Sequence, residues 1–233
     1  MSAEVDEMFS RIADRYDVTN RFISLGTDLW VRRKTVEAAQ PEPGASVLDC
    51  AAGTGDLTFM FREAVGPDGH VVGTDVNDDM LELARRKADE RGIEDIEWEV
   101  QDALHLPYKD DTFDIVAIAY GVRNVDDPEA ALESMARVTK PGGQVIVLEF
   151  GQPAAPLRPF YWTYNRFVIP VVGGLVSGEP EAYRYLQRTS DEFPSGDAFV
   201  EMMRRTGVFD DIEARSYMMG VNYVYAGTVA SET

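Results

Sequence analysis

Short apolar runs alternate with longer helical stretches after about residue 45, and this rhythm predicts β-strands separated by helices. The alternation favours a parallel sheet that is flanked by helices, so the expected fold class is α/β. We expect the strands of this sheet at Ser46–Cys50, His70–Asp75, Ile96–Val100, Phe113–Ala119 and Gln144–Phe150. Two last strands, around Asp211–Tyr217 and Tyr223–Val229, are separated by a turn at Gly220, which predicts an antiparallel terminal hairpin.

Capping residues predict where the helices between these strands begin and end. Asn77 can cap a helix whose acidic first turn suits the helix dipole, and this helix is expected to run to Arg91 and stop at Gly92. Other helices are expected at Asp56–Val65, from about Asp127, and from Ser195 to just before Gly207. Because the sequence has no internal repeats or long linkers, we expect one domain over residues 1–233.

Two segments do not follow the alternating pattern. The first 40 residues have a helical pattern in which polar and aromatic residues are mixed. The second segment, Gly151–Glu192, is a long connection after the fifth strand and carries many large aromatic residues. Long connections at the carboxyl edge of a parallel sheet usually serve ligands, so this segment is a candidate for substrate binding. For any single aromatic residue, simple cover of the sheet stays the alternative.

The chain is strongly acidic, because its 233 residues include 41 carboxylates against 22 lysines and arginines, a net charge of −19. This negative charge argues against electrostatic binding to nucleic acid or anionic lipid, so no nucleic-acid partner is expected. A salt-adapted host and an ordinary solvated acidic surface both account for the charge, and the sequence leaves the two open. Hydrophobic residues make up 45% of the chain, which is ample for a globular core.

Few residues are available for disulfides or metal sites. Cys50 is the single cysteine and is expected to be a small buried core residue. With His70 and His105 as the two histidines, no metal site is predicted. The N-terminal stretch lacks the basic and apolar regions of a secretory signal, and the apolar run Phe167–Val176 is too short to cross a bilayer. We therefore expect a soluble, cytoplasmic protein.

The stretch VLDCAAGTGDLT, from Val47 to Thr58, has the order of a cofactor-binding loop. A strand ends near Cys50, the glycines at 53 and 55 let the backbone turn close to a ligand, and a helix follows. On its own this motif is weak, because many glycine-rich turns join a strand to a helix. The residues that follow the next two strands therefore decide how the loop is interpreted.

Acidic residues follow both of those strands. Asp75 ends the second strand, where a carboxylate can accept hydrogen bonds from both ribose hydroxyls. Asp102, next to Ala103 after the third strand, can receive the exocyclic amine of an adenine. Each aspartate alone also fits a strand end or a helix cap. The glycine loop, Asp75 and Asp102 follow three successive strands, and together they indicate a nucleoside site.

The ligand of the glycine loop is expected to be cationic. A dinucleotide loop usually has a third glycine, but Thr58 stands there, and Asp56 places negative charge where a pyrophosphate would lie. Asp49 and Asp56 suit the ammonium and sulfonium charges of S-adenosylmethionine (SAM), which has an adenosine end and no phosphate. The order of elements from Val47 to Phe150 resembles that of small-molecule methyltransferases.

Over nearly its whole length the chain resembles the ubiquinone/menaquinone biosynthesis C-methyltransferase family. The resemblance is carried by four blocks: RYDVTNRFISLG (Arg15–Gly26), YGVRNVDD (Tyr120–Asp127), RVTKPGGQVIVLEF (Arg137–Phe150) and YRYLQRTSDEFP (Tyr183–Pro194). The chain departs from the family at Thr19, where Met is usual, at Gly151, where Ser is usual, and at Ala119, where Ser is frequent. These departures leave the quinone species open more than they challenge the reaction type.

The resemblance implies a class I SAM-dependent methyltransferase with a Rossmann-like, seven-stranded sheet and SAM as its cofactor. It implies methyl transfer to a ring carbon of demethylmenaquinol or a related polyprenyl quinol. The cofactor-binding positions that it assigns are Gly53, Thr54, Gly55, Asp75, Asp102 and Ala103. Tyr16, Asp17 and Asn20 would belong to a lid formed by residues 1–40, with a helical hinge and ordinary capping as the alternative, and residues 151–192 would hold the quinol ring and the start of its tail.

The chemistry of the reaction points to Arg123 and Asn124, in the loop after the fourth strand, as catalytic residues. In-line methyl transfer to carbon needs alignment of the two reactants and no protein nucleophile. Because a nearby cation favours the phenolate form of the quinol, Arg123 is expected to steady that charge or to orient a water that takes the proton. Asn124 is expected to hydrogen-bond the ring oxygen.

Other functions stay open at this point. The same site would serve a methyltransferase acting on another hydrophobic phenol or a sterol, and a non-catalytic binding protein could retain the pocket. A nicotinamide-dependent oxidoreductase is disfavoured by Asp56 and Thr58. A polyprenyl tail implies at least transient peripheral membrane contact, for which the apolar residues near Phe167–Val176 are candidates. The oligomeric state is left open, a homodimer included.

Overall fold

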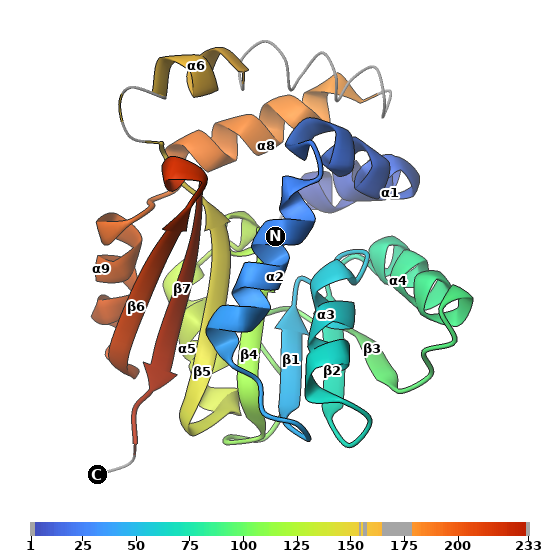
Figure 1. Ribbon diagram of the computed structural model, residues 1–233, viewed down its shortest axis with the longest axis vertical. Coiled ribbons are helices and arrows are strands. Elements are labelled where there is room, and N and C mark those ends of the chain that lie inside the picture. The colour runs from blue at the N-terminus through green and yellow to red at the C-terminus, as the bar shows by residue number, and fades with distance from the viewer. Residues whose placement is uncertain (1–2, 154, 156–157, 165–178, 232–233) are drawn as a thin grey trace.

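The computed structural model describes residues 3–153, 155, 158–164 and 179–231. Within these ranges, seven strands form one sheet in the order β3-β2-β1-β4-β5-β7-β6 (Figure 1). The parallel strands are β1 (Ser46–Cys50), β2 (His70–Asp75), β3 (Ile96–Val100), β4 (Phe113–Ala119) and β5 (Thr139–Phe150). The last two strands, β6 (Phe209–Tyr217) and β7 (Asn222–Val229), form an antiparallel hairpin that pairs with β5. The predicted fold class and terminal hairpin are confirmed.

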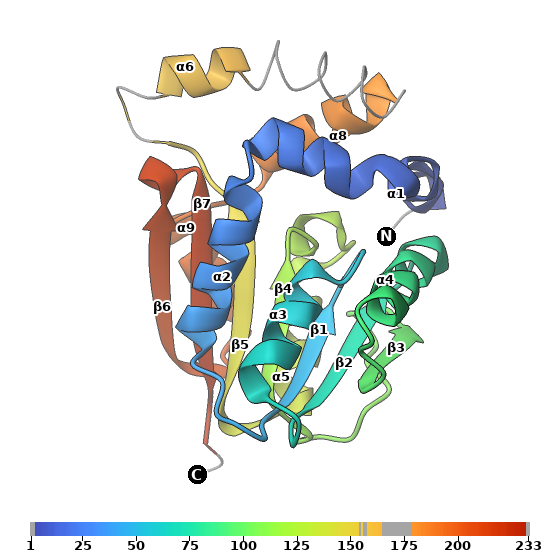
Figure 2. The same cartoon turned by 45° about the vertical axis from the view of Figure 1, so that its right-hand side comes forward.

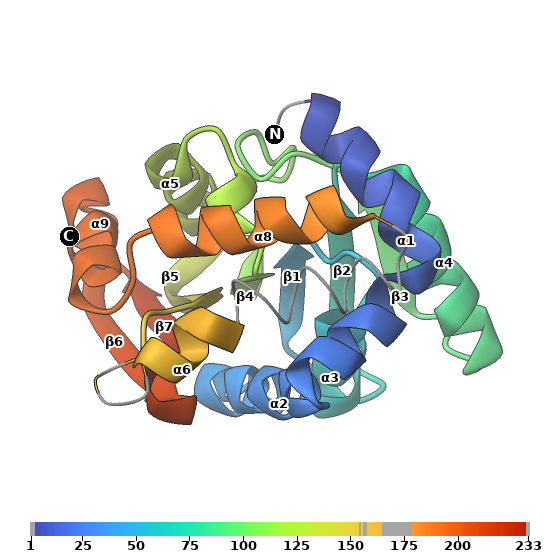
Figure 3. The same cartoon turned by 90° about the horizontal axis from the view of Figure 1, so that it is seen from above.

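Helices cover both faces of the sheet. The helices that do so are α2 (Thr27–Ala39), α3 (Asp56–Val65), α4 (Asp78–Glu90), α5 (Pro128–Val138) and α9 (Asp197–Thr206). Seen from above, α2 and α3 lie on one face and α5 and α9 on the other (Figure 3), while α4 packs against β2 and β3. Among the described residues, two short 3-10 helices follow strands, η1 (Val122–Asn124) after β4 and η3 (Met218–Gly220) between β6 and β7.

Strand β4 shows why the apolar runs of the sequence are continuous. Val116 and Ile118 belong to the core cluster shared with α5 and α9, whereas Ile115 and Ala117 belong to the cluster shared with α2 and α3. Successive side chains of a strand point to opposite faces of the sheet, and both faces are covered here. A central strand must therefore be apolar at nearly every position.

Two predicted helix starts are confirmed in atomic detail. Asn77 precedes α4, and its side-chain oxygen accepts a hydrogen bond from the Met80 amide at 2.9 Å. Asp127 precedes α5, and its carboxylate accepts one from the Ala130 amide at 3.1 Å. Each cap satisfies an amide that has no partner within its own helix, so the start is fixed by residues close in sequence.

Two predicted boundaries are wrong by a few residues, because contacts distant in sequence decide them. β5 begins at Thr139 rather than Gln144, since residues 140–143 form a bulge inside the strand and do not end it. α9 begins at Asp197 rather than Ser195, since Gly196 has non-helical backbone angles (φ 60°, ψ −131°) and its amide donates to the Tyr225 hydroxyl of β7 at 2.7 Å.

Three helices lie across the carboxyl ends of the parallel strands, α1 (Ala3–Ser24), α6 (Arg158–Thr163) and α8 (Pro180–Glu192) (Figure 2). α1 turns into α2 through Leu25 and Gly26, which have positive φ angles of 52° and 78°. The helical pattern expected for the first 40 residues is thus confirmed where the structure describes them. Among the described residues, the apolar stretches of the helices are too short to cross a membrane.

Candidate active site

The loop after β1 turns through residues with left-handed backbone angles. Gly53 and Gly55 have φ of 57° and 84°, and Ala51 has φ of 51°. A Cβ atom on Gly55 would come within 2.6 Å of the Trp98 ring, whereas a Cβ atom on Gly53 would meet nothing within 4 Å. Gly55 is therefore required for packing between α3 and the sheet, and Gly53 leaves open space in front of the loop.

The Asp75 carboxylate joins this loop to the end of β2. Its Oδ2 accepts the Gly53 amide at 2.8 Å, and its Oδ1 accepts the Asn77 amide at 2.9 Å. Burial raises the pKa of Asp75 to about 6, although the two amides lower it in part. The structure thus brings two residues expected to bind the cofactor into direct contact.

The third segment expected to bind the cofactor follows β3, which pairs with β2 so that Val100 lies opposite Asp75. Asp102 is half-buried, and its carboxylate accepts the Leu104 amide at 3.0 Å, which holds the turn. Ala103 is buried in the core cluster beneath α5. Asp102 therefore lies one strand away from Asp75, at the same edge of the sheet.

The two carboxylates expected to face a cationic ligand have different partners. Asp49 is 1% exposed, and its Oδ2 accepts the Thr58 hydroxyl at 2.6 Å, while its Oδ1 has no hydrogen-bond partner among the described residues. Burial raises the pKa of Asp49 to about 7. Burial would also raise the pKa of Asp56, but neighbouring cations, Lys87 first, lower it to about 2. Asp56 is already neutralised by cations of the protein, which speaks against its expected contact with a cationic ligand, whereas Asp49 keeps one carboxylate oxygen without a partner among the described residues.

Helix α1 is fastened to the glycine loop by a polar network. Asp17 accepts the Thr54 hydroxyl at 2.6 Å with one carboxylate oxygen and the Lys87 ammonium at 2.8 Å with the other. Lys87 also donates to Asp56 at 2.8 Å, and Arg21 of α1 donates to the other oxygen of Asp56 at 2.6 Å. Lys87 comes from α4, and no motif in the sequence pointed to it. Thr54, an expected cofactor contact, donates its hydroxyl to the helix above it.

The two expected catalytic residues follow β4 and have separate partners. Arg123 donates to Glu149 at 2.7 Å and to the Tyr120 carbonyl at 2.7 Å, and the Arg123 and Glu149 side chains are 3% and 1% exposed. Burial raises the pKa of Glu149, although the arginine lowers it in part. Asn124 faces α8 instead, where its Oδ1 accepts the Tyr185 hydroxyl at 3.2 Å. Glu149 was missed by sequence reasoning, which had no signal for a partner on another strand.

A cavity of about 360 Å³ lies between α1, α2, α6 and α8 and the ends of β4 and β5. Its lining includes several aromatic side chains from distant parts of the chain: Tyr16, Tyr120, Phe150, Tyr161 and Tyr164. The Tyr120 ring stacks on Phe150 at 4.4 Å, and the Arg32 guanidinium lies 5.3 Å from its centre. Tyr120 also has a φ of 57°, which is rare for a large residue and typical of functional sites. Arg123 belongs to the lining and Asn124 lies outside it.

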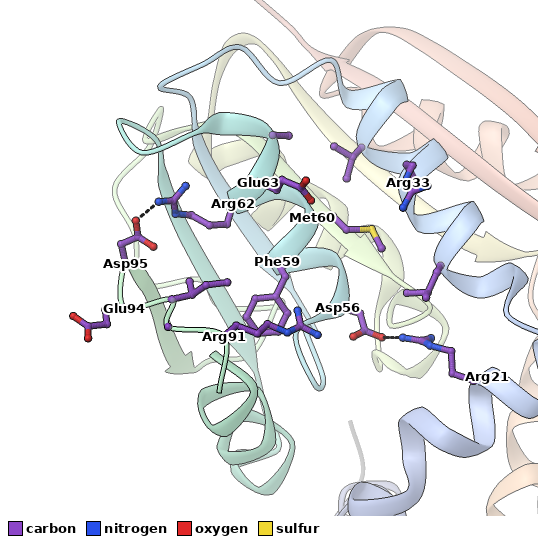
Figure 4. A pocket seen from close by; sticks show the side chains of 15 residues that line it. Arg21, Arg33, Asp56, Phe59, Met60, Arg62, Glu63, Arg91, Glu94 and Asp95 are labelled. Atoms are coloured by element: carbon purple, nitrogen blue, oxygen red, sulfur yellow. Dashed lines mark hydrogen bonds and ion pairs between the residues drawn. The ribbon is translucent and has the colours of Figure 1, made fainter. Parts of the chain in front are cut away.

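A larger hollow of about 1000 Å³ lies beside α2, α3 and the turn before β3 (Figure 4). Several charged side chains of its lining already have a partner within the lining. Arg62 pairs with Asp95, and Arg91 lies 4.3 Å from the centre of the Phe59 ring. Asp56 lines this hollow but is already paired with Arg21 and Lys87, and the other residues expected to bind the cofactor or to act in catalysis lie outside its lining. The smaller aromatic cavity is therefore the better candidate for the substrate site.

The fold and the strand-end site define a class of protein. A SAM-dependent methyltransferase of Thermotoga maritima superposes with a TM-score of 0.69 at 19% sequence identity, covering 96% of this chain and 99% of its own. A SAM-dependent methyltransferase of Aquifex aeolicus gives a TM-score of 0.63 at 19% identity, covering 91% and 93% of the two chains. The chain has the fold of the SAM-dependent methyltransferases.

Sequence similarity identifies the family. The sequence model of the ubiE/COQ5 methyltransferase family matches residues 1–229. The ubiquinone/menaquinone biosynthesis C-methyltransferase UbiE of Bdellovibrio bacteriovorus is 44% identical over 226 residues, which cover 97% of this chain and 95% of the relative. The demethylmenaquinone methyltransferase of Thermus thermophilus is 44% identical over 223 residues, covering 94% and 99%. The chain belongs to the ubiE/COQ5 methyltransferase family, and the resemblance inferred from its motifs is confirmed.

Proposed function

We propose that this protein transfers a methyl group from SAM to a ring carbon of demethylmenaquinol or a related polyprenyl quinol. Its family and the names of its relatives support this reaction. The observation that carries the proposal is the aromatic cavity with the buried Arg123 in its wall, next to the glycine loop. The segments that follow β1 and β4 lie close together, because a Cβ atom on Gly121 would lie 2.6 Å from the Ala51 side chain.

The residues around the glycine loop fit SAM better than a dinucleotide. Open space faces Gly53, and the buried Asp49 has an oxygen with no partner among the described residues. The nearby cation Lys87 is bound to two carboxylates of the protein and is not available to a phosphate. When bound, SAM supplies an electrophilic methyl group on a sulfonium. The residues proposed to hold it are Gly53, Thr54, Gly55, Asp75, Asp102 and Ala103.

Arg123 is proposed to favour the phenolate form of the quinol. The phenolate oxygen would make the neighbouring ring carbon electron-rich enough to take the methyl group that SAM would supply, and that ring carbon would then lose its proton to restore the aromatic quinol. Arg123 lines the cavity, and the Nε of its guanidinium has no hydrogen-bond partner among the described residues, so the guanidinium is the group that would donate to the oxygen or to a water beside it. Asn124 stays a proposed catalytic residue, although it lies outside the cavity lining and its oxygen accepts from Tyr185, so only its amide nitrogen is left to donate to the ring oxygen.

We also propose that residues 1–233 form one methyltransferase domain, in which residues 1–40 act as a lid and residues 151–192 as a substrate-binding insertion. The contact between Asp17 and Thr54 supports the lid, and Tyr16 and Asn20 line the cavity from the same helix. The Tyr164 hydroxyl donates to the carbonyl of residue 23 in α1 at 2.7 Å, which joins the insertion to the lid. Together these segments would exclude water from the reacting groups.

Labelled SAM and a demethylmenaquinol with a short tail test the proposed function. The purified protein is expected to give a product heavier by one methyl group, and to give no transfer to a sterol or a tocopherol-like phenol. Transfer to one of those acceptors, with none to the quinol, would favour the other methyltransferase reaction. Binding of NADH, without binding of SAM or S-adenosylhomocysteine, would contradict the methyltransferase site.

The affinity for SAM is expected to fall as the pH is lowered from about 8 to about 5.5. Burial raises the pKa values of Asp49 and Asp75 to about 7 and about 6, and a cationic ligand favours the ionised form of both. Below these pKa values, binding must release protons, so the affinity falls by up to about tenfold per pH unit for each group. Above about pH 7 both groups are ionised, and the affinity is expected to level off.

Calorimetry of SAM binding in two buffers with different ionisation heats measures both the affinity and the protons released. The Asp75→Asn variant removes the lower of the two titrations and is expected to flatten the profile below about pH 6. An affinity that does not change with pH, in the wild-type protein, would contradict a ligand role for these carboxylates.

A further inference from the structure

Large apolar side chains are exposed at one corner of the molecule, near the aromatic cavity. Phe22 and Leu25, at the end of α1, are 61% and 83% exposed, and Trp30 in α2 is 43% exposed. Met218 and Met219, in the turn between β6 and β7, are 39% and 60% exposed. We refer to these five residues as the apolar rim.

The apolar rim is continuous with the cavity. Leu25 and Met218 are exposed to solvent and also line the cavity. Trp30 contacts the strand end that leads into η3, because its ring centre lies 5.6 Å from that of Tyr217. Tyr161 of α6 lines the same cavity as Leu25 and Met218. The rim therefore borders an opening of the cavity and is not a set of scattered surface residues.

The backbone is strained where rim side chains are exposed. Leu25, Met218 and Met219 have φ angles of 52°, 52° and 59°, in the left-handed region that is unfavourable for residues with a Cβ atom. Glycine is the usual residue at such positions, and large apolar residues are usually buried. Strain of this kind is concentrated at functional surfaces, so the exposed side chains indicate a surface with a partner.

We propose that the apolar rim inserts into the surface of a zwitterionic lipid bilayer, and that the polyprenyl tail of the quinol leaves the cavity between the rim residues. This inference rests on the proposed function, because it takes the tail from the proposed substrate. The cavity volume of about 360 Å³ is near the lower limit for a drug-sized ligand, so the cavity holds the ring and only the start of a long tail. The bilayer supplies the apolar surroundings that the rest of the tail requires.

The net charge of −19 favours this partner over two others. An anionic bilayer and a second copy of this chain would both be repelled by the acidic surface. A zwitterionic bilayer carries no net charge and binds the rim through burial of apolar surface alone. The run Phe167–Val176, first expected to contact the membrane, lies outside the described residues and takes no part in the inference.

Flotation with phosphatidylcholine vesicles tests the rim directly. The wild-type protein is expected to float with the vesicles, and the F22S/M219S variant to partition at least about tenfold more weakly, because two apolar insertions are lost. The matched control V100S changes a side chain that is 49% exposed on β3, and it is expected to bind like the wild-type protein. Equal binding of the wild-type protein and F22S/M219S would overturn the proposal, as would failure of the wild-type protein to float. A dimer that F22S/M219S dissociates would assign the rim to a second copy.

Methyl transfer separates failure of this inference from failure of the proposed function. Although Phe22 belongs to the segment proposed as a lid, its side chain is 61% exposed and, like that of Met219, lies outside the cavity lining, so F22S/M219S is expected to methylate a short-tail quinol in buffer at the wild-type rate. It is expected to methylate a long-tail quinol in vesicles at least about tenfold more slowly. Equal slowing on both substrates would overturn the inference and leave the proposed function intact. If the wild-type protein methylates neither quinol, the proposed function fails, and the vesicle experiment still decides the role of the rim.

Discussion

Replacing Arg123 with alanine is expected to lower the rate of methyl transfer by about 10²–10³-fold, the loss typical when one donor to a developing oxyanion is removed. The same change is expected to lower the free energy of unfolding by about 3–5 kcal/mol, because it leaves the Glu149 carboxylate buried without its cation. Single-turnover kinetics with a short-tail quinol measure the first effect, and urea denaturation measures the second.

The double variant R123A/E149Q separates the catalytic contribution from the structural one. A glutamine at position 149 no longer buries an unpaired charge, so most of the lost stability is expected to return. The rate is expected to stay low, because the donor to the phenolate is still missing. Recovery of the rate together with the stability would mean that Arg123 contributes only to folding.

Alanine at Gly53 and alanine at Gly55 are expected to affect different properties. G53A is expected to lower the free energy of unfolding by about 1–2 kcal/mol, from the left-handed backbone alone, because its side chain meets nothing within 4 Å. That side chain would occupy the space proposed for SAM, so the affinity for S-adenosylhomocysteine is expected to fall by about tenfold to about 100-fold. G55A is expected to lower the free energy of unfolding by about 3 kcal/mol, because a Cβ atom there would lie 2.6 Å from the Trp98 ring.

Urea denaturation measures the stability of the two glycine variants, calorimetry measures their affinity, and each variant is the control for the other. Both substitutions add one methyl group at a left-handed position, so only the surroundings of that methyl group differ. Full affinity for S-adenosylhomocysteine in G53A would place the cofactor elsewhere than in front of the loop. Unchanged stability in G55A would mean that the Trp98 ring moves aside more easily than the packing indicates.

The strands and several helix starts could be predicted from the sequence because the features that determine them are local. β4 is covered on both faces, so its run is apolar throughout. Asn77 and Asp127 cap their helices through amides three residues away. The start of β5 could not be predicted, because residues 140–143 either end a strand or bulge within it, and only pairing with β4 decides between the two.

The candidate site also combines residues that could be placed from the sequence with residues that could not. Gly53 and Asp75 could be placed together from the sequence, because the carboxyl ends of adjacent parallel strands meet at one edge of the sheet. The ion pair between Arg123 and Glu149 joins residues 26 positions apart on two strand ends, and neither residue type reveals the other. The sequence could not show that Asp56 is neutralised within the protein, because the cations that pair with it come from α1 and α4, far from it in sequence.

Neighbouring residues of α1 belong to two compartments, since Asp17 bonds to Thr54 in the glycine loop while Tyr16 lines the aromatic cavity. In the proposed reaction, SAM or the quinol, whichever binds first, would restrict the motion of α1. The ligand that binds second would then lose less conformational entropy of the protein. By thermodynamic linkage this effect would be reciprocal, so SAM and the quinol would each raise the affinity for the other. In the proposed reaction, this one helix would couple the binding of SAM and of the quinol within a single subunit.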